Sequence, residues 1–362
     1  MKNNQIVLIH GTGYQEMTET LLERIDLAAD IPGPDCRIGV KPNLVVAAKA
    51  SGGAVTHPEM VAGVLAYLQR HGFRRIEVLD GSWVGDSTER ACEVSGIGAV
   101  CRKYGVPFTD LQRDAARPCD AAGLPMRVCA RALDTEFLIN MPVLKGHCQT
   151  KVTCALKNLK GLLPNAEKRR FHALGLHKPI AHLNTVLTNG LILVDNICGD
   201  LDFEEGGNPV TMDRIFACKD PVLCDAFACR VMGYRSEEVP YIGLAEQLGV
   251  GCADLSKAEL IALNEGSAEE HASSRRVQAL GRCIAPREAC SACYGSLIYA
   301  LSRMEQRGTL RDRREKLCIG QGYRGESGEI GIGSCTCGFH SSLPGCPPQA
   351  AEILDFLENC WK

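Results

Sequence analysis

Residues 56–82 read THPEMVAGVLAYLQRHGFRRIEVLDGS, and this stretch combines one helix with one strand. Apolar side chains recur in its first part at the spacing of one helix face, which predicts a helix from Pro58 to about His71. The members of this apolar stripe are Met60, Val61, Val64, Leu65 and Leu68. The following run, Arg75–Asp80, has an aliphatic interior and ends at Asp-Gly, which predicts a strand.

The ends of the predicted helix carry signals of their own. Pro58 suits the first turn, because the first amide hydrogens of a helix have no partner within it. Thr56 and Glu59 fit a T-x-x-E capping box, and Gly72 suits the C-terminal cap. By the same reasoning, Asp220 is expected to cap a helix that has Pro221 at its first position. Two cysteines of that helix, at positions 224 and 229, lie on different faces and are expected to be core thiols.

Short apolar runs alternate with helical patterns over residues 1–265. The strands expected there are Gln5–His10, Arg37–Val40, Arg75–Asp80, Glu136–Asn140 and Leu191–Asp195. Such alternation predicts an α/β domain, with a mostly parallel sheet flanked by helices. Ligands of these sheets bind beyond the carboxyl ends of the strands. The polar residues that follow the expected strand ends are therefore candidates for ligand binding: Lys41, Asn43, Asp80, Ser82 and the pair Asp195-Asn196.

The segment 145–182 is strongly basic, with eight lysines and arginines and one acid. Lysines and backbone amides of such a segment could bind a phosphate or a carboxylate. The basic residues are interleaved with Gly, Asn and Thr, which favours this interpretation over the alternative of a solvated face. Candidates for binding the anion are Lys157, Asn158 and Lys160. Candidates for catalysis are Lys145, His147 and His172, because histidine titrates near neutral pH.

The segment 195–209 is acidic, with five acids and no basic residue. Its carboxylates could bind a divalent cation through oxygen ligands. The spacing does not fit an EF-hand, and a solvated acidic loop is an equal alternative.

The chain holds 20 cysteines, and eight of them lie after residue 280. The composition changes near residue 265, so we expect a linker at 266–279 and a small cysteine-rich module at 280–362. Cys290 and Cys293 form a C-x-x-C pair, and Cys346 precedes a proline, as the last ligand of bacterial ferredoxin clusters does. The fourth ligand is Cys335 or Cys337. This set would accept a [4Fe–4S] cluster, with zinc as the alternative.

The segment Leu343–Pro348 resembles a cluster-ligand motif in the small subunits of hydrogenases and of respiratory complex I. There a helix with a similar apolar pattern follows the motif, and here the corresponding run is Ala350–Leu357. This resemblance favours the iron–sulfur cluster over zinc. The other cysteines of the module are expected to be spare thiols.

Composition excludes several classes of partner. The 362-residue chain has a formal net charge of −3 and only 5% aromatic residues, which argues against binding of nucleic acid. No stretch approaches the roughly 18 apolar residues of a membrane-spanning helix, and the N-terminus shows no secretory signal. We therefore expect a cytoplasmic protein without membrane or nucleic-acid partners.

Several short motifs occur together in this order: Lys41–Val45, Thr56–Glu59, Asp80–Ser82, Leu144–His147, Leu156–Gly161, Arg170–His172, and Asp220-Pro221 with Asp225. This series resembles the DUF362 family (domain of unknown function 362) of uncharacterised iron–sulfur proteins, and the resemblance runs from about residue 5 to 265. Many members carry a ferredoxin-type run of four cysteines that this chain lacks, so two clusters are not expected.

A second resemblance links Lys157–Pro164 and the nearby histidines to the nickel-pincer lactate racemases. In that family a lysine carries the cofactor and histidines move protons. Three functions follow as expectations. The first is a redox or cofactor-maturation enzyme that binds a small anionic molecule and meets a redox protein partner. The second is a non-catalytic electron-transfer protein, and the third is an isomerase or racemase with a structural metal.

Overall fold

The computed structural model describes residues 1–266, 275–310 and 315–361. Within these residues the chain forms two compact units. The first holds residues 1–168 and 177–266, and the second holds residues 169–176 together with the described residues from 275 onward. The linker expected at 266–279 falls mostly on residues 267–274, which lie outside the described ranges.

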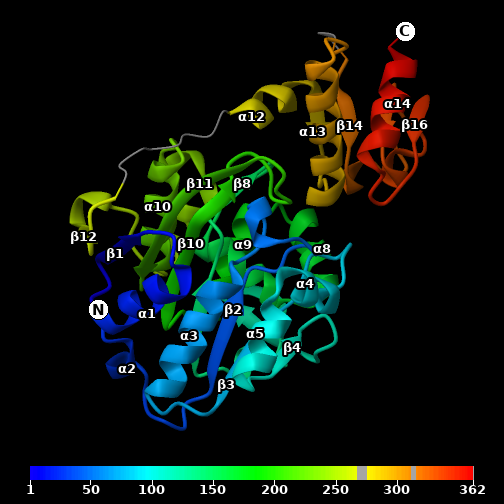
Figure 1. The fold of residues 1–362 in the computed structure, drawn as a ribbon. Coiled ribbons are helices and arrows are strands. Elements are labelled where there is room, and N and C mark those ends of the chain that lie inside the picture. The colour runs from blue at the N-terminus through cyan, green and yellow to red at the C-terminus, as the bar shows by residue number, and fades with distance from the viewer. Residues whose placement is uncertain (267–274, 311–314, 362) are drawn as a thin grey trace. The chain divides into compact units, whose positions relative to one another are not determined.

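An eight-stranded sheet in the order β12-β1-β11-β10-β7-β2-β3-β4 forms the first unit (Figure 1). Its strands are β1 (Gln5–His10), β2 (Ile38–Pro42), β3 (Ile76–Asp80), β4 (Phe108–Asp110), β7 (Phe137–Met141), β10 (Leu191–Asp200), β11 (Pro209–Cys218) and β12 (Glu259–Ala262). Five strand pairs are parallel, and β11 runs antiparallel to both of its neighbours. The predicted mostly parallel α/β sheet is therefore confirmed.

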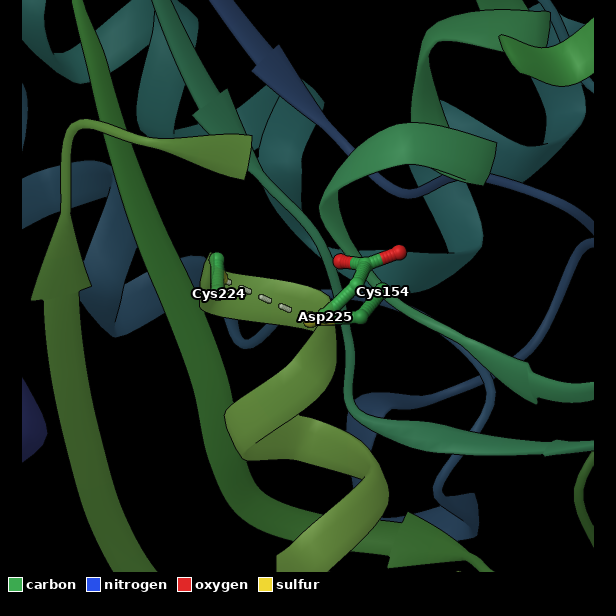
Figure 2. A group of neighbouring side chains, drawn as sticks. All are labelled: Cys154, Cys224 and Asp225. Carbon is green, nitrogen blue, oxygen red and sulfur yellow. Dashed lines mark hydrogen bonds between the residues drawn. The ribbon is translucent and has the colours of Figure 1, made fainter. Parts of the chain in front are cut away.

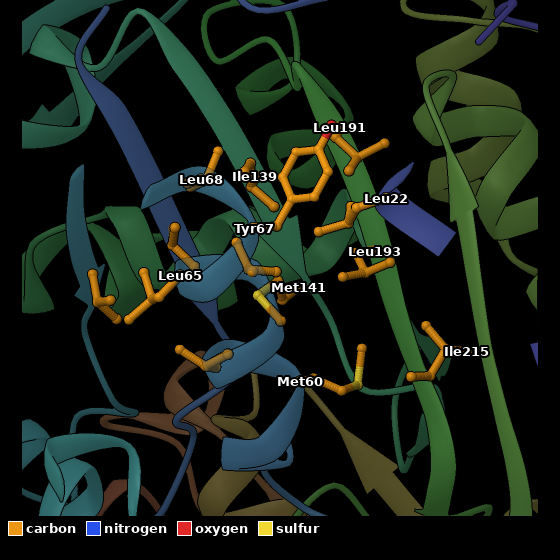
Figure 3. Close-up of a cluster of buried hydrophobic side chains, with 14 of the residues drawn as sticks. Leu22, Met60, Leu65, Tyr67, Leu68, Ile139, Met141, Leu191, Leu193 and Ile215 are labelled. Carbon is orange, nitrogen blue, oxygen red and sulfur yellow. The ribbon is translucent and has the colours of Figure 1, made fainter. Parts of the chain in front are cut away.

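Helices cover both faces of this sheet. One face carries α1 (Tyr14–Arg24), α3 (Pro58–Arg70) and α5 (Ile97–Tyr104), which share a core with the strands. Figure 3 shows Leu65 and Leu68 of α3 in that core with Leu191 and Leu193 of β10. The other face packs against α10 (Pro221–Val231), where Phe227 meets Phe216 of β11 edge-on at 5.2 Å between ring centroids. A strand that is buried on both faces has a continuous run of apolar residues in its sequence, as the first residues of β10 do.

The helix predicted from residues 56–82 is α3, and its N-terminal cap differs from the predicted one. The N-cap is His57, whose side chain makes no capping hydrogen bond. The expected capping box of Thr56 and Glu59 is therefore wrong. The Thr56 hydroxyl instead donates to the Met141 carbonyl oxygen and accepts from the Asn43 amide, each at 2.8 Å, and so it ties the loop after β2 to β7.

The C-terminal end of α3 follows expectation. Gly72 has a φ of 82°, its amide donates to Gln69, and the amide of Phe73 donates to Leu68. These two bonds form a Schellman motif, which favours glycine at the left-handed position. The expected cap of α10 is also present, because the Asp220 carboxylate accepts from the amides of Val222 and Leu223. Cys224 and Cys229 of this helix are buried, as expected for core thiols.

The remaining elements of the first unit are shorter. They are the helices α2 (Leu27–Asp30), α4 (Thr88–Ser95), α6 (Ala130–Asp134), α7 (Ala155–Asn158), α9 (His177–Leu183) and α11 (Pro240–Gln247), and the hairpins β5 (Ala116–Ala121) with β6 (Leu124–Cys129) and β8 (Lys145–His147) with β9 (Lys151–Thr153). Helix α8 (Asn165–Ala173) has residues in both units.

The second unit has its own small sheet and core. Four parallel strands form the sheet, namely β13 (Ile284–Pro286), β14 (Leu317–Ile319), β15 (Ile330–Ile332) and β16 (Ser341–Leu343). The helices are α12 (Arg276–Leu280), α13 (Ser291–Gln306) and α14 (Ala350–Cys360), and α14 begins where the sequence predicted a helix. Leu297 and Leu301 of α13 are buried, as are Ile353 and Leu357 of α14. Across the described parts of both units, no helix combines the length and apolar character needed to cross a membrane.

Candidate functional site

Two charged side chains meet where β2 and β3 end. The ammonium of Lys41 lies 2.8 Å from Oδ1 of Asp80, and both residues are at most 2% exposed. The other carboxylate oxygen of Asp80 accepts from the Leu44 amide at 2.8 Å, and the Ser82 hydroxyl donates to the Leu44 carbonyl oxygen at 2.6 Å. The carboxyl ends of two neighbouring parallel strands thus bring Lys41, Asp80 and Ser82 together, in the region where α/β sheets bind ligands.

Helix α7 adds a side-chain amide to this pair. Nζ of Lys41 donates to Oδ1 of Asn158 at 3.3 Å, and Nδ2 of Asn158 donates to Oδ1 of Asn140 at 2.7 Å. A side chain at Gly161 would run into both Lys41 and Asp80, so only glycine lets this backbone approach. Burial lowers the pKa of Lys41, and the charge of Asp80 opposes that effect.

A second lysine lies near Asp80. Nζ of Lys168 donates to the carbonyl oxygens of Gly81 at 2.9 Å and Ser82 at 2.8 Å. Burial lowers its pKa to about 8, against the opposing charge of Asp80. We call Lys41, Asp80, Asn158 and Lys168 the Asp80 group. It contains two ammonium groups and one carboxylate.

A second set of buried polar residues lies around Glu204, which comes from the loop between β10 and β11. One oxygen of its carboxylate contacts Nζ of Lys157 on α7, and the other lies 3.1 Å from Nε2 of His147 on β8. Nζ of Lys145, also on β8, donates to the backbone oxygens of Ala54 at 2.6 Å and Glu204 at 2.9 Å. It lies 3.4 Å from Oδ1 of Asn43. We call Lys145, His147, Lys157 and Glu204 the Glu204 group.

The surroundings of His147 determine its protonation. Nδ1 accepts from the amides of Gln149 at 3.0 Å and Thr150 at 3.1 Å, so the neutral ring carries its hydrogen on Nε2. That hydrogen has no hydrogen-bond acceptor among the described residues. Burial, with the charge of Lys157, lowers the pKa of His147 to about 4. The expectation that His147 titrates near neutral pH is therefore wrong in this environment.

Lys145, like Lys168, has a pKa that moves toward the physiological range. Burial lowers the pKa of Lys145 to about 8, and the charge of Glu204 opposes this shift. Burial alone would raise the pKa of Glu204, but Lys157 and His147 outweigh it and hold that pKa well below its usual value. At neutral pH the Glu204 group therefore contains two ammonium groups, one carboxylate and a neutral imidazole.

Both groups carry more positive than negative charge in a buried environment. Lys145 and Lys168 contact only neutral oxygens, and among the described residues no carboxylate oxygen lies within 4.0 Å of either ammonium. A buried charge without a counterion is unfavourable, because low-dielectric surroundings replace its hydration. This excess is the property expected of a site that binds an anion.

The acidic segment uses its carboxylates within the protein. Asp195 accepts from the backbone amide of His57 at 2.7 Å and lies 2.9 Å from its Nδ1. Asp200 accepts from the amides of Asp202, Phe203 and Asn208, each at 2.9 Å. These carboxylates shape the β10–β11 region, so the structure favours neither a cation site nor a fully solvated loop.

Two of the expected residues lie apart from both groups. Lys160 is on a short 3₁₀ turn, Leu159–Leu162, and is half-buried. Its charge contributes to the lowered pKa of His147. His172 lies on α8, among the residues that belong to the second unit.

Four cysteines of the second unit come from three separate segments. Cys290 is the N-cap of α13, Cys293 lies in the first turn of that helix, Cys335 lies on a 3₁₀ turn, and Cys346 precedes α14. Burial raises the pKa of Cys293 to about 12, with further contributions from the other three thiols. Burial likewise raises the pKa of Cys290, with contributions from Cys346 and Cys335. The contributions of Cys335 and Cys346 to both of these pKa values indicate that the four thiols lie near one another.

Donor groups face two of these thiols. Nε2 of Gln321 donates to Sγ of Cys290 at 3.7 Å. A hydrogen bond with Cys335 raises the pKa of Arg324, with smaller contributions from Cys346 and Cys290. Cys337, the alternative fourth ligand, is exposed, as is Cys346, whereas Cys290, Cys293 and Cys335 are half-buried.

One tight cluster of possible metal ligands lies in the first unit and was not expected. Cys154, Cys224 and Asp225 have ligand atoms within 4.8 Å of one another, and the two sulfurs are 4.0 Å apart (Figure 2). The Asp225 carboxylate accepts from the amides of Ala155 at 2.7 Å and Leu156 at 3.3 Å, so it caps α7 from α10. Burial raises the pKa of both thiols, and of Asp225 to about 7. The trio is therefore a polar contact within the core that fixes α7.

Comparison with known proteins gives the family of the chain. The model of DUF362, described as a domain of unknown function, matches residues 38–230. The chain belongs to the DUF362 family. The matched region contains all residues of the Asp80 and Glu204 groups and ends before the cysteine-rich segment that begins after residue 280.

Other similarities of this DUF362 protein are more distant. Over 242 residues it is 23% identical to a thylakoid-associated protein of Synechocystis, covering 64% of this chain and 74% of that protein. A crystal structure from Thermotoga maritima matches with 14% identity and a TM-score of 0.35, over 51% of each chain. The lactate racemase apoprotein of Thermoanaerobacterium thermosaccharolyticum matches with 12% identity and a TM-score of 0.38, over 67% of this chain and 56% of that one. The match thus spans little more than half of each solved chain.

Three parts of the site were missed by sequence reasoning. Glu204 was read only as one acid of a loop, and Lys168 as one of several basic residues. His57, which meets Asp195, was noted only as part of a motif. For the contact between His57 and Asp195, the sequence did hold a signal, since Asp195 lies near the end of an expected strand. Nothing local in the sequence pairs Glu204 with Lys157, because 47 residues separate them.

Proposed function

We propose that this DUF362 protein is a cytoplasmic redox or cofactor-maturation enzyme. Its second unit would hold a [4Fe–4S] cluster, and its first unit would bind a small anion. The observation that carries the proposal is a group of four thiols from three segments, in which Cys335 and Cys346 contribute to the raised pKa of both Cys290 and Cys293. Four grouped thiols are a typical ligand set for a metal centre. The ligands would be Cys290, Cys293, Cys335 and Cys346.

The spacing of these thiols favours a cluster over zinc. Four sulfurs on one zinc ion lie about 3.8 Å apart, given a Zn–S distance of about 2.3 Å and tetrahedral geometry. Within the described residues of the second unit, no three possible ligand atoms lie within 4.8 Å of one another. Sulfurs that bind four different iron atoms of a cluster lie farther apart, so the thiol set suits a cluster. The donors from Gln321 and Arg324 would stabilise sulfur that carries negative charge.

When bound, a cluster would supply one-electron transfer. The residues of the first unit would bind and orient the anion. The ammonium groups of Lys145 and Lys157 would pair with the charge of the anion. Asn43 would orient Lys145, and Lys41 and Asn158 would complete the polar surroundings. Lys145 would exchange a proton more readily than His147, because its pKa lies near 8 and that of His147 near 4.

Anaerobic purification with analysis of iron, sulfide and zinc tests the cluster. We expect about four irons and four sulfides per chain, and visible absorbance that bleaches with dithionite. Cys290→Ser and Cys335→Ser should lose most of the iron, whereas Cys337→Ser and the control Cys360→Ser should retain it. Colourless protein with stoichiometric zinc would exclude a redox cluster and leave the racemase-type alternative with a structural metal.

A separate measurement tests the anion site. We expect small dianions to raise the melting temperature of the cluster-loaded protein, and Lys157→Met to abolish that rise. If the cluster loads but no anion stabilises the protein, the alternative of a non-catalytic electron-transfer protein replaces the enzyme. A redox protein partner remains a prediction under either outcome.

A further inference from the structure

The carboxylate of Glu204 lies where a ligand carboxylate would be bound. One of its oxygens contacts the ammonium of Lys157, and the other lies 3.1 Å from Nε2 of His147. The geometry of that second contact does not form a hydrogen bond, so Nε2 is a buried polar atom without a hydrogen-bond partner in the described part of the chain. The backbone oxygen of Glu204 accepts from Lys145. A small carboxylic acid could bind in the same place, with one carboxylate on the Lys157 ammonium and in reach of the unused Nε2 of His147.

The residue that occupies this position belongs to a loop. Residues 201–208 connect β10 to β11 without regular secondary structure. The base of the loop is anchored, because Asp200 accepts from three of its amides and the Gly207 amide donates to Gly52. The next residues after Glu205, Gly206 and Gly207, have φ values of 78° and 126°, a backbone region that glycine adopts without strain. Displacement of Glu204 would therefore need a rearrangement of residues 204–205 only, because the amides of Phe203 and Gly207 on either side are held.

Charge decides what would replace Glu204. His147 is neutral, because its Nδ1 accepts two backbone amides. Removal of Glu204 from the group leaves Lys145 and Lys157 as two buried ammonium groups. Glu205 and Asp200 act on Lys145 only from a distance, without an ion pair. A ligand with one carboxylate would leave one lysine without a counterion in contact, whereas a ligand with two carboxylates could contact both.

We propose that Glu204 is an internal substitute for a ligand carboxylate, and that the ligand of this site is a small dicarboxylate that displaces it. One ligand carboxylate takes the position between Lys157 and His147. The other pairs with Lys145, which Glu204 now contacts only through its backbone oxygen. The inference deepens the proposed function, since it rests on the anion site and names the ligand class.

Binding measurements on the full-length, cluster-loaded protein test the inference. The probes are malonate, acetate and inorganic phosphate, followed by calorimetry and by thermal shift. Glu204→Gln should raise the affinity for malonate by about tenfold or more, because the competing carboxylate is gone. Glu204→Asp, which withdraws the carboxylate by one methylene, should raise it by less. Lys157→Met should abolish malonate binding in either background.

The matched control is Glu205→Gln, which removes the carboxyl group of the next loop residue. That carboxyl acts on Lys145 and Lys157 through its charge, but it forms no ion pair with either lysine. We expect little change in malonate affinity, so an equal gain in both variants would reduce the effect to general electrostatics and overturn the inference. Malonate binding that needs Lys157 but is not improved in Glu204→Gln or Glu204→Asp would also overturn it, with the anion site intact.

The remaining outcomes separate the ligand classes. Phosphate bound as tightly as malonate would overturn the dicarboxylate assignment, because it would show selection of charge alone. Acetate bound as tightly would overturn the requirement for two charges. If no probe binds to the wild type or to any variant, the anion site of the proposed function is itself wrong.

Discussion

His147 is the residue whose environment changes its chemistry most. Its ring is buried, and Nδ1 already accepts two backbone amides, so protonation would need a new arrangement of the turn. The pKa of about 4, against 6.5 for an ordinary histidine, follows from burial and the charge of Lys157. The unfolded chain therefore binds a proton between pH 6.5 and 4 that the folded chain does not bind. The stability of the fold falls as the pH drops through this window.

We predict that His147→Asn flattens this part of the pH profile. Asparagine can accept from the same two amides but does not titrate. The acid-induced loss attributable to His147 is on the order of 3 kcal/mol across the window. Urea unfolding at several pH values between 4 and 7 measures it, and His71→Asn, an exposed site, is the control. An unchanged slope in His147→Asn would show that the imidazole stays protonated in the folded protein.

Asp225 acts in the opposite direction within an overlapping window. Burial raises its pKa to about 7 from an ordinary 3.8, so the folded chain holds a proton that the unfolded chain releases. Its contribution to stability is present below pH 4 and is lost as the pH rises toward 7. We predict that Asp225→Asn gains stability relative to the wild type as the pH rises from 4 to 7. Loss of relative stability over that range, measured by the same unfolding series, would mean that the carboxylate is charged while it caps α7.

At the scale of elements, the two ends of α3 show how local signals succeed or fail. Gly72 has a positive φ, and no atom would contact an added Cβ. We predict that Gly72→Ala costs about 1 kcal/mol of unfolding free energy, through backbone strain alone. Gly243 also has open space, but it lies within α11, so Gly243→Ala should stabilise by about 0.5–1 kcal/mol. Denaturant unfolding of the two variants gives the contrast, and equal signs would contradict the cap geometry.

The same helix shows where sequence reasoning stops. The apolar stripe and Gly72 are local properties, so they predicted α3 correctly. The capping box failed because Thr56 binds Met141, a partner 85 residues away that no local pattern reveals. Strand β11 was missed for a related reason. The first half of β11 consists of exposed and half-buried residues and lacks an apolar run. It forms a strand because it pairs with β10 on one side and β1 on the other.

The candidate site shows the same difference between local sequence patterns, which could be predicted, and contacts between distant residues, which could not. Lys41 and Asp80 could be placed together, because the carboxyl ends of parallel strands share one edge of a sheet. The basic segment could be read as an anion site from its composition. The partner that balances it, Glu204, could not be found, because a loop conformation brings it to Lys157 and His147. Burial then reversed the expected roles of Lys145 and His147, and burial is a property of the folded chain.

At the scale of the molecule, two units with separate cores imply separate unfolding. The first unit is stabilised by a large core on its sheet, whereas the second has a small core between four three-residue strands and the helices α12, α13 and α14. Small units of this kind depend on bound metal for much of their stability. A ligand stabilises only the cooperative unit that binds it, by an amount set by its concentration and affinity. The two proposed ligands should therefore act on different transitions.

We predict two transitions in scanning calorimetry of the anaerobic protein. Removal of iron should lower the melting temperature of one transition by about 10 °C or more, since a lost metal site costs several kcal/mol in a small unit. Malonate should raise only the other transition, and Cys290→Ser should abolish the effect of iron while leaving that of malonate. Matched runs with Cys360→Ser control for the loss of a thiol. A single transition that both ligands shift would show that the two units unfold as one, and then the second unit would draw its stability from the first instead of from its metal.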